Sequence, residues 1–143
     1  MIFFDASAAA KRYFQEVGSE RVEELWSSSE SLSSLAILHC ELASALNRKF
    51  RERALTRDTY HVLKAQISQD LRKLRTVAAD ASLIGTSLQV LDSHPLKALD
   101  SLYIAGALNL RNSNLRVLFV SADRQLLRAA EAEGLKVLNP EAA

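Results

Sequence analysis

The chain opens with Met1-Ile2-Phe3-Phe4-Asp5-Ala6, an apolar run that ends abruptly in a carboxylate. A short, fully apolar segment bounded by small residues is typical of a buried strand, and the alanine-rich residues 6–10 predict the start of a helix. Asp5 therefore stands where a strand ends. In open α/β sheets ligands bind outside the carboxyl ends of the strands, so this acid occupies a position where chemistry usually occurs.

A second acid follows a second strand. Residues 117–120 form the strongest strand candidate of the chain, and Asp123 comes after it with only two small residues between. The pattern then predicts a short helix over 125–133 and a last strand over 135–138. Two predicted strands thus lead into acids.

Most of the remaining chain has apolar residues at helical spacing. The expected helices cover residues 6–16, 19–26, about 35–53, 56–74, 80–91 and 96–110, with a weak strand candidate at 32–35. Glu41 lies on the apolar stripe of the third of these helices, and Asp100 lies on the margin of the stripe in the last one. An acid on a buried stripe needs an explanation.

Local signals mark the expected helix ends. Gly18 is expected to stop the first helix, Ser34 or a neighbour to cap the third, and Asp80 to cap the fifth. The apolar stripe of the fifth helix is expected to comprise Leu83, Ile84, Leu88 and Leu91.

The alternation of strands and helices predicts the fold class. It favours a parallel sheet with right-handed crossovers and helices on both faces. A chain of 143 residues has the size of one domain. We therefore predict an α/β protein, a three-layer α/β/α domain with a central, mainly parallel sheet.

Composition excludes several classes of protein. The apolar fraction of 48% and charged fraction of 24% are ordinary for a globular protein, so disorder is not expected. Because Lys and Arg total 18 against 17 acids, no overall field points to nucleic acid. Cys40 stands alone, which excludes an intramolecular disulfide and fits a reducing compartment. With neither a basic leader nor an apolar stretch of membrane-spanning length, we expect a soluble, cytoplasmic protein without a membrane partner.

A local basic stretch is more informative than the net charge. Nine of the 18 basic residues fall between positions 48 and 75, against three acids. A ligand that bears phosphate could be flanked there by Arg48, Lys49, Arg51 and Arg53. A charge run on a helix is more often a solvated face, and composition alone favours that interpretation.

Four acids are candidates for a common site: Asp5, Glu41, Asp100 and Asp123. Each also has an ordinary explanation. Asp5 and Asp123 could cap the helices that follow them. Glu41 and Asp100 could be solvated edges of amphipathic helices. The combination of all four favours a site.

Electrostatics dictates what such a site would need. Two carboxylates about 4 Å apart repel by roughly 4 kcal/mol even at an effective dielectric constant near 20. A cluster must therefore hold protons at raised pKa values or bind a divalent cation, and an all-oxygen site suits Mg²⁺ or Mn²⁺. Such an ion activates water and neutralises a phosphoryl oxygen, so the fitting reaction is phosphodiester hydrolysis.

The order and spacing of these segments resemble the PIN-domain ribonucleases, and among them the VapC-type toxins of toxin–antitoxin pairs. The resemblance covers nearly the whole chain, and we expect a single PIN-like domain over residues 1–143. The segments that carry it are Asp5-Ala6-Ser7-Ala8, Glu41 in a long helix, the central helix 96–105 with Asp100, and Val120-Ser121-Ala122-Asp123 before a helix, Gly134 and a short strand.

This resemblance implies a Mg²⁺- or Mn²⁺-dependent endoribonuclease, usually dimeric, that a cognate antitoxin inhibits by occupying the groove at the site. The matching catalytic and metal-binding acids are Asp5, Glu41, Asp100 and Asp123, with Asp5 and Asp100 as direct ligands. Ser7 and Ser121 match the supporting hydroxyls. The basic residues Arg48, Lys49, Arg51 and Arg53 then become candidates for an RNA-facing or antitoxin-facing surface.

Two positions depart from the family pattern. Ala6 stands where many members carry Thr, and Tyr103 stands where a His often follows the central Asp. Because neither position carries an acid, we expect metal binding to persist and substrate contacts near Tyr103 to differ.

Other readings fit the residues less well. A receiver-like phosphoacceptor needs paired acids at its first strand, and a haloacid-dehalogenase-like phosphatase needs an acid where Ser7 stands. The four glycines are too scattered for a phosphate-binding loop, and the three histidines share no metal-ligand spacing. The remaining alternative is a catalytically inactive PIN scaffold that binds protein or RNA. Such a module would gain stability by losing its mutually repelling acids.

Overall fold

The computed structural model describes residues 1–142, and this part of the chain forms five strands and seven helices. In chain order they are β1 Ile2–Phe4, α1 Ala6–Ala10, α2 Ser19–Trp26, β2 Leu32–Leu35, α3 Leu38–Arg51, α4 Arg57–Leu71, β3 Arg75–Val77, α5 Ala81–Ser93, α6 Ala98–Asn112, β4 Leu118–Val120, α7 Arg124–Ala132 and β5 Lys136–Leu138.

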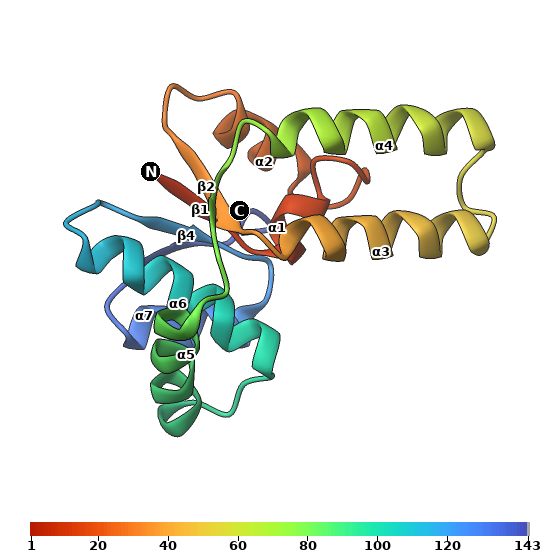
Figure 1. The fold of residues 1–143 in the computed structure, drawn as a ribbon. Coiled ribbons are helices and arrows are strands. Elements are labelled where there is room, and N and C mark those ends of the chain that lie inside the picture. Colours follow the sequence, from red (N-terminus) through yellow and green to blue (C-terminus); the bar gives the residue numbers. More distant parts are fainter. Residues whose placement is uncertain (143) are drawn as a thin grey trace.

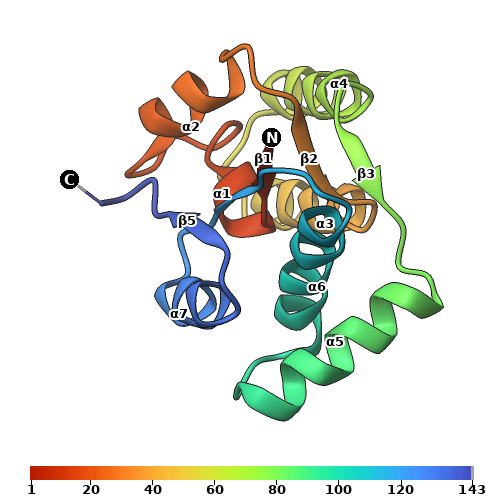
Figure 2. The ribbon, with the colours of Figure 1, turned by 90° about the vertical axis from the view of Figure 1, so that its left-hand side faces the viewer.

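The five strands form one sheet in the order β3-β2-β1-β4-β5, and all neighbouring strands run parallel. The opening strand β1 is therefore the central one. It pairs with β2 through Ile2 and Leu32, and with β4 through Phe4 and Val120. Strand β3, for which no expectation was stated, forms one edge of the sheet (Figure 2).

Helices cover both faces of this sheet, which confirms the predicted three-layer α/β/α fold (Figure 1). Successive side chains of a strand point to opposite faces. Phe3 packs on one face with residues of α5, α6 and α7, whereas Ile2 and Phe4 pack on the other face with residues of α1, α2, α3 and α4. Phe3 and Phe4 are fully buried, so the central strand contributes to both halves of the core.

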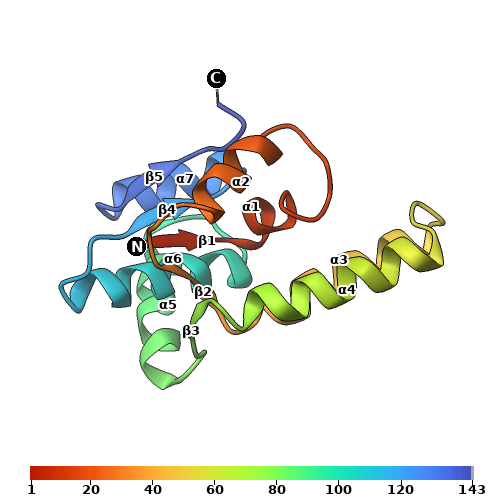
Figure 3. The same cartoon turned by 90° about the horizontal axis from the view of Figure 1, so that it is seen from above.

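Helices α3 and α4 form an antiparallel hairpin that projects beyond the sheet (Figures 1 and 3). The Tyr60 hydroxyl donates to Asn47 Oδ1 at 2.9 Å, and the rings of Phe50 and Tyr60 stack with 4.6 Å between their centroids. Arg53, in the turn between the helices, adopts a left-handed φ of 58°. These side chains thus join the two helices to each other along the hairpin.

The prediction that the first helix continues to residue 16 is wrong. Helix α1 ends at Ala10, because the chain turns there to bury Tyr13 and Phe14. Gly18 does not stop α1 but precedes α2, with a φ of 88°. A Cβ at Gly18 would lie 2.7 Å from the carbonyl oxygen of Pro140, so the glycine permits a close approach of the C-terminal segment.

Two further expectations about helices need correction. Ser34 does not cap α3, since it is buried within β2 and its hydroxyl donates to the carbonyl oxygen of Phe4 at 2.7 Å. In α5, Ile84 and Leu88 are 48% and 57% exposed, because this helix packs against α6 through a different face, which carries Leu83, Ser87 and Val90. Among the helices of residues 1–142, none combines the length and the apolar character needed to cross a lipid bilayer.

Candidate active site

The candidate acids lie at the edge of the sheet where its central strands end. Asp5 and Ser121 directly follow Phe4 and Val120, which are paired neighbours in β1 and β4. Glu41 stands in the first turn of α3, just beyond β2, and Asp100 stands in the first turn of α6. Parallel strands bring their carboxyl ends to one edge, where ligands bind in open α/β sheets.

Asp5 is the most buried of these acids, with 4% of its surface exposed. The Ser7 hydroxyl donates to both carboxylate oxygens at 2.9 and 2.8 Å, and the Ser121 hydroxyl donates to Oδ2 at 2.7 Å. The backbone N–H of Ala8 donates to Oδ1 at 2.9 Å, so Asp5 also caps α1. Within residues 1–142 no cationic side chain forms an ion pair with Asp5.

Burial raises the pKa of Asp5 from its ordinary value of 3.8 to about 6. The hydrogen bonds from Ala8, Ser121 and Ser7 oppose this rise, and the negative charge of Asp100 adds to it. Burial therefore makes the negative charge on Asp5 less favourable than it is in water, although three donors stabilise the ionised form.

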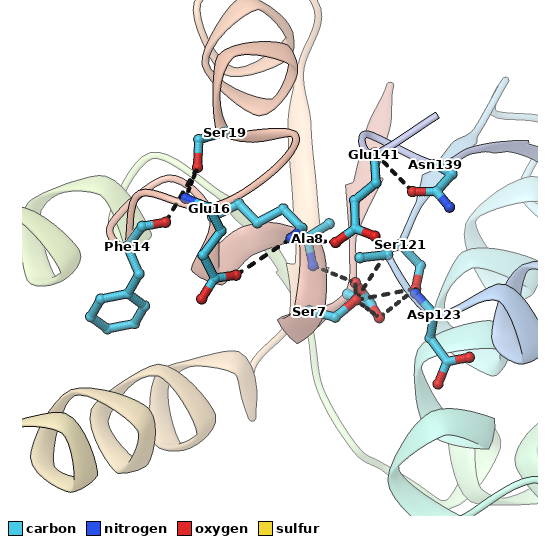
Figure 4. A network of polar contacts seen from close by, with 12 residues as sticks. Ser7, Ala8, Phe14, Glu16, Ser19, Ser121, Asp123, Asn139 and Glu141 are labelled. Carbon is cyan, nitrogen blue, oxygen red and sulfur yellow. Dashed lines mark hydrogen bonds and ion pairs between the residues drawn. The ribbon is translucent and has the colours of Figure 1, made fainter. Parts of the chain in front are cut away.

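The two serines tie Asp5 to the loop after β4. Their hydroxyl oxygens lie 3.3 Å apart, and Ser7 Oγ accepts from the backbone N–H of Ala122 at 2.9 Å. Ser121 Oγ accepts from the backbone N–H of Asp123 at 3.0 Å. Figure 4 shows Ser7 and Ser121 converging from α1 and from this loop. The network fixes the positions of two candidate acids relative to each other.

Asp100 is half-buried and has Asp123 as a charged neighbour. Burial raises the pKa of the Asp100 carboxyl above its ordinary value, the charge of Asp123 adds to the rise, and Lys97 opposes it. Asp123 is exposed, and its Oδ1 accepts from the backbone N–H groups of Gln125 and Leu126 at 2.8 and 3.1 Å. Asp123 is thus the N-cap of α7 and at the same time a neighbour of Asp100.

Glu41 is half-buried, and its Oε2 accepts a hydrogen bond from the hydroxyl of Tyr103. Tyr103 lies one turn after Asp100 in α6 and is 2% exposed. Burial raises the pKa of the Tyr103 hydroxyl, and the carboxylates of Glu41, Asp5 and Asp100 raise it further. The hydroxyl therefore lies among three of the four acids.

The four acids do not meet in one compact cluster. Within residues 1–142, no three His, Cys, Asp or Glu side chains are placed to hold one metal ion together. The donor chemistry nevertheless fits a hard divalent cation, since it consists of carboxylate and hydroxyl oxygens without a pairing lysine or arginine at Asp5. Which of these oxygens bind a metal stays a prediction.

Residues 2–132 match the model of the PIN domain family. The chain belongs to the PIN domain family. Two proteins of Mycobacterium tuberculosis, named Ribonuclease VapC45 (strain CDC 1551 / Oshkosh) and Ribonuclease VapC49 (strain ATCC 25618 / H37Rv), are each 26% identical to it over 137 residues. The alignment covers 96% of this chain and 94% of each relative.

Solved structures share the fold of this PIN domain. FitAcB from Neisseria gonorrhoeae aligns over 100% of both chains with a TM-score of 0.74 and 18% identity. VapBC2 from Rickettsia felis, bound to a DNA fragment from its promoter, covers 97% of this chain and 98% of that one with a TM-score of 0.64 and 12% identity. PAE2754 from Pyrobaculum aerophilum covers 98% and 83% with a TM-score of 0.63 and 20% identity. At these identities the likeness concerns the fold alone.

A cavity of about 620 Å³ borders Glu41, the one candidate acid in its lining. The lining also includes Ser7, Leu99 of α6, and Arg48 of α3. The cavity thus connects the candidate site to the α3–α4 hairpin. A second cavity, of about 570 Å³, lies at the opposite edge of the sheet around Ile2, Leu118 and Lys136, and its lining contains none of the four candidate acids.

The four basic residues predicted to face RNA or an antitoxin occupy different surroundings. Arg48 is exposed and lines the cavity. Lys49 is half-buried, with its Nζ 4.8 Å from the ring centroid of Phe14, so it contributes to packing. Arg51 and Arg53 are exposed at the far end of the hairpin. Within this set Arg48 is the residue that borders the candidate site.

Two buried charged groups of the PIN domain were not predicted from the sequence. Lys11 is 5% exposed, and its Nζ lies 2.7 Å from Glu141 Oε1 and 3.4 Å from Glu16 Oε2; Figure 4 shows both acids. Asp70 is 4% exposed and accepts from Arg12 Nε at 2.8 Å. No local pattern predicts either group, because the closest partner of each, Glu141 for Lys11 and Arg12 for Asp70, comes from a distant part of the chain.

Proposed function

We propose that this PIN domain is a divalent-metal-dependent endoribonuclease that hydrolyses RNA phosphodiester bonds. Asp5 carries the proposal, since it is a buried carboxylate beside Asp100 with no ion pair in residues 1–142. Keeping like charges together in a protein is costly unless a cation or a proton compensates them. The matched relatives from Mycobacterium tuberculosis are named ribonucleases, and they align over nearly their whole length.

Mg²⁺ or Mn²⁺ is the proposed cofactor, held directly by Asp5 and Asp100, with Glu41 and Asp123 binding it directly or through water. When bound, such an ion supplies an activated water and neutralises charge on a phosphoryl oxygen. Ser7 and Ser121 orient the Asp5 carboxylate through three short hydrogen bonds. Arg48 supplies positive charge in the adjoining cavity, where RNA phosphates would bind.

In its biological setting the chain acts as the toxin of a toxin–antitoxin pair, in the cytoplasm and as a homodimer. The matched relatives carry VapC names, and solved chains of the same fold come from FitAB and VapBC2 assemblies bound to DNA. The antitoxin would occupy the cavity lined by Ser7, Glu41 and Arg48 and thereby exclude RNA.

One observation favours a second function, a catalytically inactive PIN scaffold that binds protein or RNA. No three acids in residues 1–142 are grouped to hold an ion. Such a scaffold would bind RNA equally well with and without a divalent ion. A dependence of activity on the ion therefore separates the two functions.

The test is incubation of the purified protein with bulk cellular RNA in Mn²⁺, in EDTA, and in EDTA followed by excess Mn²⁺. The expected result is fragmentation in Mn²⁺, intact RNA in EDTA, and fragmentation again after Mn²⁺ is restored. Asp5→Asn is expected to leave the RNA intact throughout, whereas Asp58→Asn, in the exposed first turn of α4, is expected to cleave like the wild type. RNA that stays intact in every condition, or is cut equally in EDTA, would overturn the proposal.

A further inference from the structure

Tyr103 belongs to the core by its ring and to the candidate site by its hydroxyl. The residue is 2% exposed, and its ring meets Phe3 edge to face with 6.5 Å between centroids. Phe3 in turn stacks on Phe119 across the paired strands β1 and β4. The packed ring therefore has a fixed place in the protein, because buried side chains in a dense core keep one rotamer.

The hydroxyl of this fixed ring is a neutral donor among negative groups. It donates to Glu41 Oε2, and a tyrosine hydroxyl is a protonated, neutral donor near neutral pH. Among the described residues, Tyr103 is the one hydrogen-bond partner of the Glu41 carboxylate, which forms no ion pair there. A side chain with three rotatable bonds is thus held at its far end.

We propose that Tyr103 is a positioning residue, whose hydroxyl holds the carboxylate of Glu41 in place beside Asp5 and Asp100. The inference rests on the proposed function, because it assigns to Glu41 a part in binding the divalent ion. Groups that orient metal ligands affect metal binding through the ligand and without touching the ion. Holding Glu41 in advance lowers the entropy cost of recruiting it.

The alternative is that Tyr103 only fills the core. Tyr103→Phe separates the two roles, since it removes one oxygen and keeps the ring that contacts Phe3. Tyr13→Phe is the matched control: Tyr13 is 7% exposed, and its hydroxyl donates to the buried carboxylate of Asp70 at 3.3 Å, outside the candidate site. Both changes remove a hydrogen bond between a buried tyrosine and a carboxylate.

The measurement is Mn²⁺ binding to the full chain by calorimetry, together with kcat and KM for RNA cleavage. Tyr103→Phe is expected to weaken Mn²⁺ binding by about 10- to 100-fold and to lower kcat more than it raises KM, whereas Tyr13→Phe leaves Mn²⁺ affinity unchanged. Glu41→Asp keeps the charge but shortens the reach, so it is expected to weaken Mn²⁺ binding similarly without disturbing the core. Adding Tyr103→Phe to Glu41→Asp is expected to cause no further loss.

The outcomes distinguish this inference from the proposed function. The positioning role is overturned if Tyr103→Phe leaves Mn²⁺ affinity unchanged, or if Tyr13→Phe lowers it as much as Tyr103→Phe does. The ribonuclease proposal stands in both cases. An additive loss in the double variant also overturns it, because Tyr103 would then act independently of Glu41. A wild-type protein that neither binds Mn²⁺ nor cleaves RNA overturns both. If Tyr103→Phe melts too early for titration, Glu41→Asp alone tests the contact, and undiminished Mn²⁺ affinity in that variant counts against the inference.

Discussion

The hydroxyl of Ser121 donates to Asp5 Oδ2 at 2.7 Å, although 116 positions separate the two residues in the chain. The bond exists because β1 and β4 are parallel neighbours whose last residues, Phe4 and Val120, are paired. It ties the most buried acid of the candidate site to the loop that carries Asp123. The environment of Asp5 is therefore set by tertiary contacts, and its ionisation reports on them.

Asp5 should give the metal-free protein a pH-dependent stability. Its folded-state pKa of about 6 lies above the ordinary 3.8, so the contribution of this group is fully present below about pH 4 and is lost as the pH rises through about 6. The loss amounts to about 3 kcal/mol, because each tenfold change in proton affinity is worth about 1.4 kcal/mol.

Asp5→Asn removes this ionisation, so the variant should not lose this stability as the pH rises. The difference in unfolding free energy, variant minus wild type, should therefore increase by about 3 kcal/mol from pH 4 to pH 7. Urea unfolding in EDTA at both pH values measures the change. Asp58→Asn, at an exposed position of α4, serves as the control and should show no such trend. An Asp5→Asn difference that is the same at both pH values would contradict the raised pKa.

Divalent ions should stabilise the fold. An ion that binds the native state alone adds about 1.4 kcal/mol for each tenfold rise in concentration above its dissociation constant, so Tm should rise with the logarithm of the Mg²⁺ or Mn²⁺ concentration. Thermal melts across a concentration series check this. The rise should be smaller in Asp100→Asn than in the wild type. A Tm that does not respond to either ion would favour the binding-module alternative.

Asp100→Asn should abolish RNA cleavage and preserve the fold. Asp100 is half-buried, and burial together with the charge of Asp123 raises its pKa. The change to Asn removes the negative charge and keeps the size of the side chain. We expect cleavage to fall by at least about 100-fold, with an unchanged circular dichroism spectrum. Asp92→Asn, on the exposed side of α5, should cleave normally. Normal activity in Asp100→Asn would remove that residue from the catalytic set.

Arg48→Glu should weaken RNA binding more than Arg53→Glu does. Both residues are exposed in or after α3, but Arg48 lines the cavity beside Glu41, whereas Arg53 stands in the turn at the far end of the hairpin. Losing one phosphate contact should reduce the slope of log affinity against log salt by about 1. Binding titrations of Asp5→Asn protein with RNA at several salt concentrations separate affinity from cleavage. Equal effects of the two reversals would assign the basic stretch to general solvated surface.

The helix starts show how far local sequence signals reach. Asp80 and Asp123 were expected or considered as caps, and each accepts from a backbone N–H two or three residues further on. A cap involves only its own neighbours in the chain, so the sequence announces it. The end of α1 was mispredicted because the burial of Tyr13 and Phe14, a tertiary effect, overrides the local helical pattern.

Part of the site follows from the same reasoning. Asp5 and Asp123 come after two apolar strands, and in a parallel sheet all carboxyl ends share an edge, so their proximity to one edge was predictable. The partner of Glu41 was not, because 62 positions separate it from Tyr103 and their contact depends on how α6 crosses the sheet. The sequence showed Tyr103 only as a departure from a family pattern.

The apolar pattern of this chain is enough to specify a three-layer parallel α/β domain with acids at one edge. The reason is that the spacing of apolar residues that distinguishes strands from helices is a property of residues close together in the chain. Packing decided the rest. The buried Asp70 finds its partner Arg12 in a distant segment, and Ile84 is exposed because α5 packs on α6 through another face. Amphipathic spacing tells that a helix has an inner side, but which residues meet there depends on the relative placement of elements far apart in the chain.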